Sequence, residues 1–148
     1  MREIVTLSAD EIAEIQLLAS IEVYGQKNYV AAITLAGAAD EILGKRLRQI
    51  GKESAFGDIK RSVLSIMEVL PETEEDSEPV ETGEADKALS FLINQTRNEL
   101  KHYSGDQPLE FDIRADASEM IDRAIANFMT LHDVTLSEFI DYWAMASE

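Results

Sequence analysis

The stretch YVAAITLAGAADEILGKRLRQIG, residues 29–51, decides the predicted fold. Its apolar residues recur every three or four positions, the spacing of one face of an α-helix; they are Ile33, Ala36, Leu43 and Leu47. We expect a helix over about 29–50 that ends before Gly51, because glycine commonly follows the last helical turn. The small residues of AGAAD, residues 36–40, allow another helix to approach closely.

Other segments carry similar helical signals. Ser8 and Glu11 have the spacing of a capping box, which predicts a helix from there to about Tyr24. Thr135 and Glu138 repeat that spacing ahead of a last helix that ends near Ala146. Further helices are expected over about 57–70, 85–103 and 117–131, with DQPLEFDIR, residues 106–114, as a loop. With no strand-like alternation or internal repeat, the sequence predicts an all-α fold, an antiparallel helical bundle of about five to six helices.

The length and composition indicate one globular domain over residues 1–148. The chain has 148 residues, 45% of them hydrophobic, which suffices for a core. It has no cysteine, which excludes disulfides, thiolate metal sites and cysteine nucleophiles and fits a cytoplasmic location. No apolar run has the length of a membrane span, and we expect neither a membrane association nor a signal peptide.

The charge is strongly acidic. The formal net charge is −16, from 29 acidic and 13 basic residues. Such a surface repels phosphate backbones at long range and counts against broad nucleic-acid affinity. Any activity on RNA would therefore need a local cluster of basic residues on an otherwise acidic surface.

Seven of the acidic residues lie in PETEEDSEPVETGE, residues 71–84. The prolines, the glycine and the run of like charges predict a solvated, mobile loop within the domain. One alternative is a metal-binding loop, but this stretch lacks the residue spacing of an EF-hand. The other alternative is an acidic mimic of phosphate.

Two helices have apolar residues on more than one side. The helix over 85–103 has a core stripe of Leu89, Leu92, Ile93, Thr96, Leu100 and Tyr103. Its opposite face has little charge and contains Ala88, Phe91, Asn94, Gln95, Asn98 and His102. The first helix has a stripe of Ile12, Ile15 and Ala19, and Leu17, Leu18 and Ile21 extend around its other side. These patterns favour a partner subunit, most simply in a homodimer; burial within one monomeric core is the alternative.

Asp40 projects onto the apolar stripe of the helix over 29–50, close to Tyr29. A carboxylate removed from water needs a cation or several hydrogen-bond donors. Arg97 is a candidate partner on the neighbouring helix. Alternatively, the helix is rotated and Asp40 reaches water.

The chain has two histidines. His132 follows Leu131 between two helices, where we expect it to interact with the end of the helix over 117–131. His102 ends the sequence RNELKH, residues 97–102, and lies four residues after Asn98, on the same helical face. Arg97 and Lys101 have the same spacing and give this helix a positive edge.

RNELKH resembles the R-x(4–6)-H signature of HEPN domains (higher eukaryotes and prokaryotes nucleotide-binding), with a polar residue after the arginine. The stretch over residues 29–47 also resembles a helix of prokaryotic members, in which an Ala/Gly patch precedes acidic residues. The resemblance implies a HEPN-like bundle and a metal-independent ribonuclease site assembled across a homodimer. It further implies that Arg97 and Lys101 bind RNA phosphates, that Asn98 orients the phosphate or the imidazole, and that His102 transfers protons.

Asp40 and Tyr103 are expected to support this site. Some HEPN toxins carry a tyrosine two residues after the histidine, where a partner nucleotidyltransferase modifies it. Here Tyr103 is adjacent to His102 and Ser104 follows, so that regulation is not predicted. An antitoxin protein is a partner that the resemblance suggests.

Two other interpretations stay open. The fold can serve as a non-catalytic module that binds a nucleotide, a phosphate or a protein, or the motif can be structural within a helical interaction domain. The sequence has no Walker loop, Rossmann glycine fingerprint or nucleophile elbow. It also has no paired carboxylate–histidine motifs, and we predict no cofactor and no metal.

Overall fold

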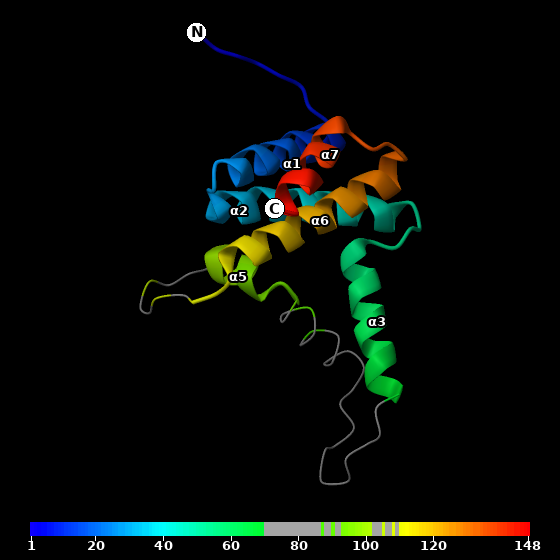
Figure 1. Cartoon of the computed structure of the whole chain (residues 1–148). Helices are drawn as coiled ribbons and strands as arrows, with labels where there is room; N and C mark the ends of the chain where they lie inside the picture. Colours follow the sequence, from blue (N-terminus) through cyan, green and yellow to red (C-terminus); the bar gives the residue numbers. More distant parts are fainter. Residues whose placement is uncertain (70–86, 88–89, 91–92, 102–104, 106–107, 109) are drawn as a thin grey trace.

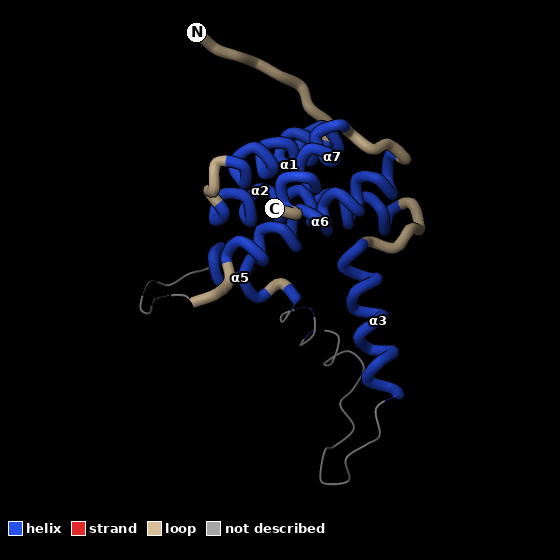
Figure 2. Tube along the Cα trace, viewed as in Figure 1, coloured by secondary structure: helices blue, strands red, loops and turns tan. Residues whose placement is uncertain are grey.

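The computed structural model describes residues 1–69, 87, 90, 93–101, 105, 108 and 110–148. The described part is helical and contains no strand (Figure 2), which confirms the predicted all-α bundle. Its helices are α1 (Ala9–Gly25), α2 (Tyr29–Gln49), α3 (Ala55–Val69), α5 (Gln95–Lys101), α6 (Ile113–His132) and α7 (Ser137–Ala146). The expected loop over residues 71–84 lies outside the described residues.

Helix α2 is the centre of the bundle. It packs against α1 on one side and against α6 on another, while α5 meets α2 and α7 meets α1 (Figure 1). The alanine-rich middle of α2 lets its neighbours come close to its backbone. The core is apolar and built from four helices; its large, fully buried side chains are Leu17, Ile33, Leu43, Leu47, Ile121, Ile125, Phe139 and Tyr142.

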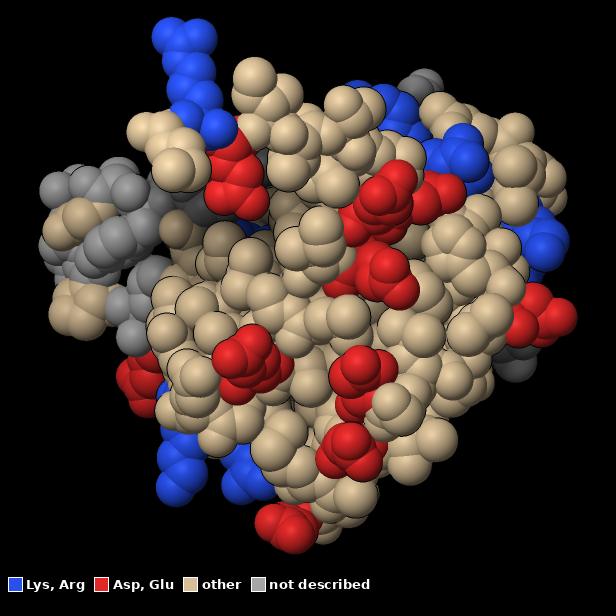
Figure 3. Space-filling model, turned by 90° about the horizontal axis from the view of Figure 1, so that it is seen from above, with Lys and Arg blue, Asp and Glu red and all other residues tan. Residues whose placement is uncertain are grey.

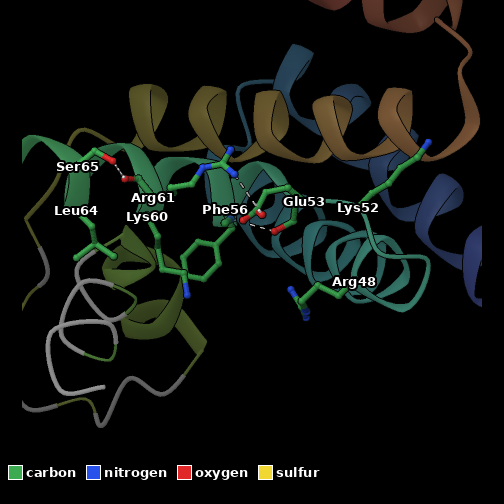
Figure 4. A pocket seen from close by; sticks show the side chains of 10 residues that line it. Arg48, Lys52, Glu53, Phe56, Lys60, Arg61, Leu64 and Ser65 are labelled. Carbon is green, nitrogen blue, oxygen red and sulfur yellow. Dashed lines mark hydrogen bonds and ion pairs between the residues drawn. The ribbon is translucent and has the colours of Figure 1, made fainter. Parts of the chain in front are cut away.

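Helix α3 leaves this bundle at an angle. Its first turns lie against α6, and the remainder extends away from the layers formed by α1, α2 and α6 (Figure 1). The side of α3 next to the end of α2 consequently borders a groove, whose lining includes Arg48, Phe56 and Lys60 (Figure 4).

Two predicted helix ends are confirmed. The Ser8 hydroxyl accepts a hydrogen bond from the Glu11 amide at 3.1 Å, and the Glu11 carboxylate accepts one from the Ser8 amide at 3.4 Å. Gly51 has φ of +76°, the left-handed conformation in which glycine carries no Cβ penalty. Both signals are local and depend on no distant contact.

Three predicted boundaries were wrong. The capping box at Thr135 does not form, because α7 begins at Ser137 after Leu136, whose side chain makes no capping hydrogen bond. Helix α6 begins four residues before the predicted 117, since Asp112 accepts a hydrogen bond from the Ala115 amide. Helix α3 begins at Ala55 rather than 57, because Ser54 caps it by accepting from the Gly57 amide.

The stripe of Ile12, Ile15 and Ala19 is not the face by which α1 enters the core. Ile12 and Ile15 are exposed, at 36% and 54%, and the buried residues are Ala13, Leu17, Ser20 and Tyr24. The small side chains of Ala13 and Ser20 allow α1 to lie close to the alanine-rich α2.

The acidic composition is visible on the surface. The face at the top of Figure 1, which Figure 3 shows directly, carries acidic side chains scattered over a largely uncharged surface. None of the helices in the described part is long and apolar enough to span a membrane.

Candidate functional site

Five polar side chains meet where α2, α5 and α6 come together. We call them the Asp40 cluster; its members are Asp40, Asn94, Arg97, Arg123 and Asn127. Asp40 is 4% exposed, so the alternative in which it reaches water was wrong. A charge so deep in the bundle requires partners, and the neighbouring helices supply them.

Arg123 and Asn127 hold the Asp40 carboxylate from α6. Arg123 Nη2 donates to Asp40 Oδ2 at 2.9 Å, and Asn127 Nδ2 donates to Asp40 Oδ1 at 2.9 Å. Because the two residues are four apart on a helix, they present adjacent donors to one carboxylate. Both carboxylate oxygens are therefore hydrogen-bonded, and the orientation of Asp40 is fixed.

The cluster also ties neighbouring segments together. Arg123 Nη1 donates to Asn94 Oδ1 at 3.1 Å, which joins α6 to the residue before α5. Asn127 Oδ1 accepts from the Ala55 backbone amide at 2.7 Å and so satisfies a free N–H group at the start of α3. The same two side chains that hold Asp40 thus also contact the start of α3 and the residue before α5.

Burial and charge act against each other in this cluster. Burial raises the pKa of Asp40, while the positive charges of Arg123 and then Arg97 oppose that rise. Burial lowers the pKa of Arg123, and Asp40 opposes that shift. Arg123 Nε is buried and has no hydrogen-bond partner within the described part of the chain. The cluster therefore holds two guanidinium groups against one carboxylate.

Arg97 is the cluster member nearest to solvent. Its Nη1 lies 3.7 Å from Asp40 Oδ2, beyond hydrogen-bond distance, and its side chain is 19% exposed. It lines a cavity of about 140 Å³ together with Arg48, Ser54 and Phe56. Arg97 therefore lies beside the cavity with a guanidinium group that forms no hydrogen bond to the described part of the chain.

Gly37 allows Arg97 to take this position. A Cβ built on Gly37 would lie 2.5 Å from Arg97 Cδ and 3.1 Å from its Cγ, closer than packed carbon atoms approach. The aliphatic stem of Arg97 thus crosses the α2 backbone at the one point of the AGAAD stretch without a side chain.

We expect Gly37→Ala to lower the free energy of unfolding by about 1–3 kcal/mol, the usual cost of overpacking a core. Helix propensity alone predicts the opposite sign, because alanine is about 1 kcal/mol better than glycine within a helix. Thermal or urea unfolding measures the difference. Gly44→Ala on the same helix is the matched control, since its added methyl would meet nothing closer than 3.5 Å. If Gly37→Ala were as stable as Gly44→Ala, Arg97 would not occupy this position.

The structure describes only some of the other predicted site residues. Asn98 is half-buried, and its backbone N–H donates to the backbone carbonyl of Asn94 at 2.9 Å. Asn98 is not among the described residues that line the Arg97 cavity. Lys101 is the last residue of α5, and its side chain lies outside the described part. His102 and Tyr103 lie outside the described residues. His132 ends α6 with its ring against Phe128, the ring centroids being 4.6 Å apart.

Asn94 belongs to the second face of its helix, for which a partner subunit was favoured and burial within the chain was the alternative. In the structure Asn94 is 9% exposed and bonded to Arg123 of the same chain, in line with the alternative at this residue. Neither Arg123 nor Asn127 was predicted as a site residue. A helical projection of residues 113–132 would have shown Arg123 and Asn127 four apart, at the edge of the apolar stripe. That pattern is the expected complement of a buried carboxylate on a neighbouring helix.

The described residues contain no cluster of three or more histidine, aspartate or glutamate side chains arranged to hold a metal ion. The arrangement instead offers guanidinium groups beside small cavities, which suits an oxyanion ligand.

The chain was compared with known proteins in three ways. No protein-family model matches it, and no match was found among curated proteins or among solved structures.

Proposed function

We propose that this protein is a HEPN-type endoribonuclease that acts as a homodimer, with Arg97 and His102 of both subunits forming the site. The observation that carries the proposal is the position of Arg97, which lies beside a buried carboxylate and at a cavity, with no hydrogen bond from its guanidinium group to the described residues. The RNELKH sequence supports it, because His102 follows the last residue of α5.

The chemistry is an attack of the ribose 2′-oxygen on the adjacent phosphorus, with departure of the 5′-oxygen. A base removes the 2′-hydroxyl proton and an acid delivers one to the leaving oxygen, so no other reactant is consumed. Histidine performs either role near neutral pH. The guanidinium of Arg97 stabilises the charge that develops on the phosphoryl oxygens. Two subunits would supply two imidazoles, one for each proton transfer.

A second candidate function is a module that binds a nucleotide or another phosphate compound without cleaving it. The cavity beside Arg97, at about 140 Å³, is smaller than the usual small-molecule pocket, and Arg97 belongs to the Asp40 cluster. Both observations are compatible with binding alone, and the net charge of −16 disfavours high affinity for long RNA.

The test is cleavage of mixed-sequence RNA by the purified chain in excess EDTA, with light scattering to give the oligomeric state. We expect a dimer and 2′,3′-cyclic phosphate ends, the product of attack by the 2′-oxygen. RNA left intact by a well-folded dimer, together with nucleotide binding lost in Arg97→Ala, would favour the second candidate. A monomer with neither property would contradict both.

A further inference from the structure

The Arg97 cavity has a second arginine in its lining that the proposed site does not use. Arg48 lies near the end of α2, is exposed, and lines this cavity together with Arg97. Its side chain also borders the adjoining groove next to α3 (Figure 4). Arg48 forms no ion pair and no side-chain hydrogen bond with the described part of the chain. It is therefore a cation at the cavity whose charge no described carboxylate neutralises.

Gly44 leaves room for the guanidinium group of Arg48 beside the backbone of α2. A Cβ built on Gly44 would lie 3.5 Å from Arg48 Nη1, 3.6 Å from Ser54 Cβ and 3.9 Å from Asn127 Nδ2. Three side chains from separate segments thus converge on one point, and all three line the Arg97 cavity. The charged end of Arg48 is consequently placed at this cavity.

The hydrogen-bond acceptors of the lining are largely engaged. Hydrogen bonds within the chain occupy the side-chain oxygens of Asp40, Ser54, Asn94 and Asn127. Among the donors, Arg48 has no partner in the described part, and neither has the buried Nε of Arg123. Because polar groups at such a place are normally satisfied, the excess of donors calls for a ligand that supplies acceptor oxygens.

The charges of the lining favour an anion. Asp40 and Arg123 lie 2.9 Å apart and neutralise each other. The remaining charged groups are Arg48 and Arg97 against Glu41, an exposed carboxylate on α2. The cavity is therefore net positive in a chain whose formal net charge is −16. Its volume of about 140 Å³ limits the ligand to a small group.

We infer that the Arg97 cavity is an oxyanion subsite in which Arg48 supplies a second guanidinium group to the phosphate that Arg97 binds. Guanidinium groups that approach one phosphate from α2 and from α5 match its oxygens with two forks of N–H donors. The inference rests on the proposed function for the identity of the oxyanion as an RNA phosphate, and inorganic phosphate tests the subsite itself.

The experiment titrates inorganic phosphate into the full-length chain at low ionic strength and follows the arginine Nε–H signals by NMR. We expect the signals of Arg48 and Arg97 to shift with one common affinity, because both groups contact one anion. Arg48→Gln should weaken phosphate binding about 2- to 5-fold, the contribution of an ion pair near the surface.

Two further variants exclude indirect effects. Glu41→Gln should strengthen phosphate binding about 2- to 3-fold, because it removes the carboxylate that repels an anion at this cavity. Lys45→Gln also removes a cation from the exposed part of α2, but Lys45 lines the cavity against α1 and not the Arg97 cavity, so the affinity should stay unchanged. Urea unfolding curves like that of the wild type show that each variant is folded.

RNA cleavage separates this inference from the proposed function. Arg48→Gln should raise KM for RNA about 2- to 5-fold and leave kcat within about twofold, since Arg48 holds the phosphate equally in substrate and transition state. Phosphate binding that depends on Arg48, in a chain that cleaves no RNA, supports the subsite and contradicts the proposed function. RNA cleavage by the wild type, with phosphate affinity and KM both unchanged in Arg48→Gln, overturns the subsite and leaves the proposed function standing. A wild-type chain that binds no phosphate also overturns the subsite.

Discussion

Replacing His102 by alanine is expected to lower the rate of RNA cleavage by about 10²–10⁴-fold, the usual loss when a general acid or base is removed. Arg97→Ala should lower kcat by about 10²–10³-fold, as the loss of one donor to transition-state charge does. Single-turnover cleavage of a labelled RNA measures both. The His102 effect should appear without a loss of RNA affinity, whereas Arg97→Ala should weaken both binding and turnover.

Arg97 variants also need a structural control. Arg97→Lys keeps the positive charge but loses the planar fork that matches two phosphate oxygens, so we expect it to bind RNA and to cleave it slowly. Arg97→Ala leaves the 2.9 Å contact between Arg123 and Asp40 intact, and the bundle should therefore stay folded. Cleavage at the wild-type rate in either the His102→Ala or the Arg97→Ala protein would contradict the proposed site.

The largest effect on stability is expected at Arg123. Arg123→Leu should lower the free energy of unfolding by about 3–5 kcal/mol at neutral pH, because it leaves Asp40 buried without its closest cation. Arg97 remains at 3.7 Å and compensates only in part. Urea unfolding measures the loss. The surface pair of Arg46 and Asp10 is the control, because it has a similar distance of 3.0 Å but side chains 39% and 28% exposed. Arg46→Leu should cost at most about 1 kcal/mol.

The pH dependence of the Arg123→Leu defect follows from the pKa of Asp40. Burial already raises that pKa above 3.8, and removal of Arg123 takes away the strongest opposing charge, so the pKa should rise further. A group whose pKa is raised in the folded state contributes its full stabilisation at pH values below its unfolded-state pKa of 3.8. That stabilisation is lost as the pH rises through the folded-state pKa. The defect should therefore shrink on acidification toward pH 4. Adding Asp40→Asn should recover part of the stability at pH 7, and a defect that stays constant with pH would exclude Asp40 as its origin.

The sequence determined the helical class and several local features. A helix was predicted at the place of each helix in the described part, although α5 begins only at Gln95 after a turn, within the helix predicted over 85–103. The capping box at Ser8 and the glycine at position 51 fixed two of the helix ends. These signals are local, since a cap or a left-handed glycine depends on residues within one helical turn. The failed capping box at Thr135 shows the limit: the right spacing was present, but the chain enters α7 one residue later, with Leu136 as its cap.

The sequence also indicated that Asp40 would need a cation, and Arg97 lies near it. Only the tertiary structure decided that Arg123 and Asn127 are its closest partners, because α6 is distant in sequence and its position depends on how three helices pack. Which of the two apolar sides of α1 enters the core was likewise decided by the packing, since Leu17 is buried and Ile12 and Ile15 are exposed. The groove between the end of α2 and the first half of α3 was also decided by the tertiary structure. Arg48 and Lys60 are twelve residues apart in the sequence, and both line this groove because α3 leaves the bundle at an angle (Figure 1).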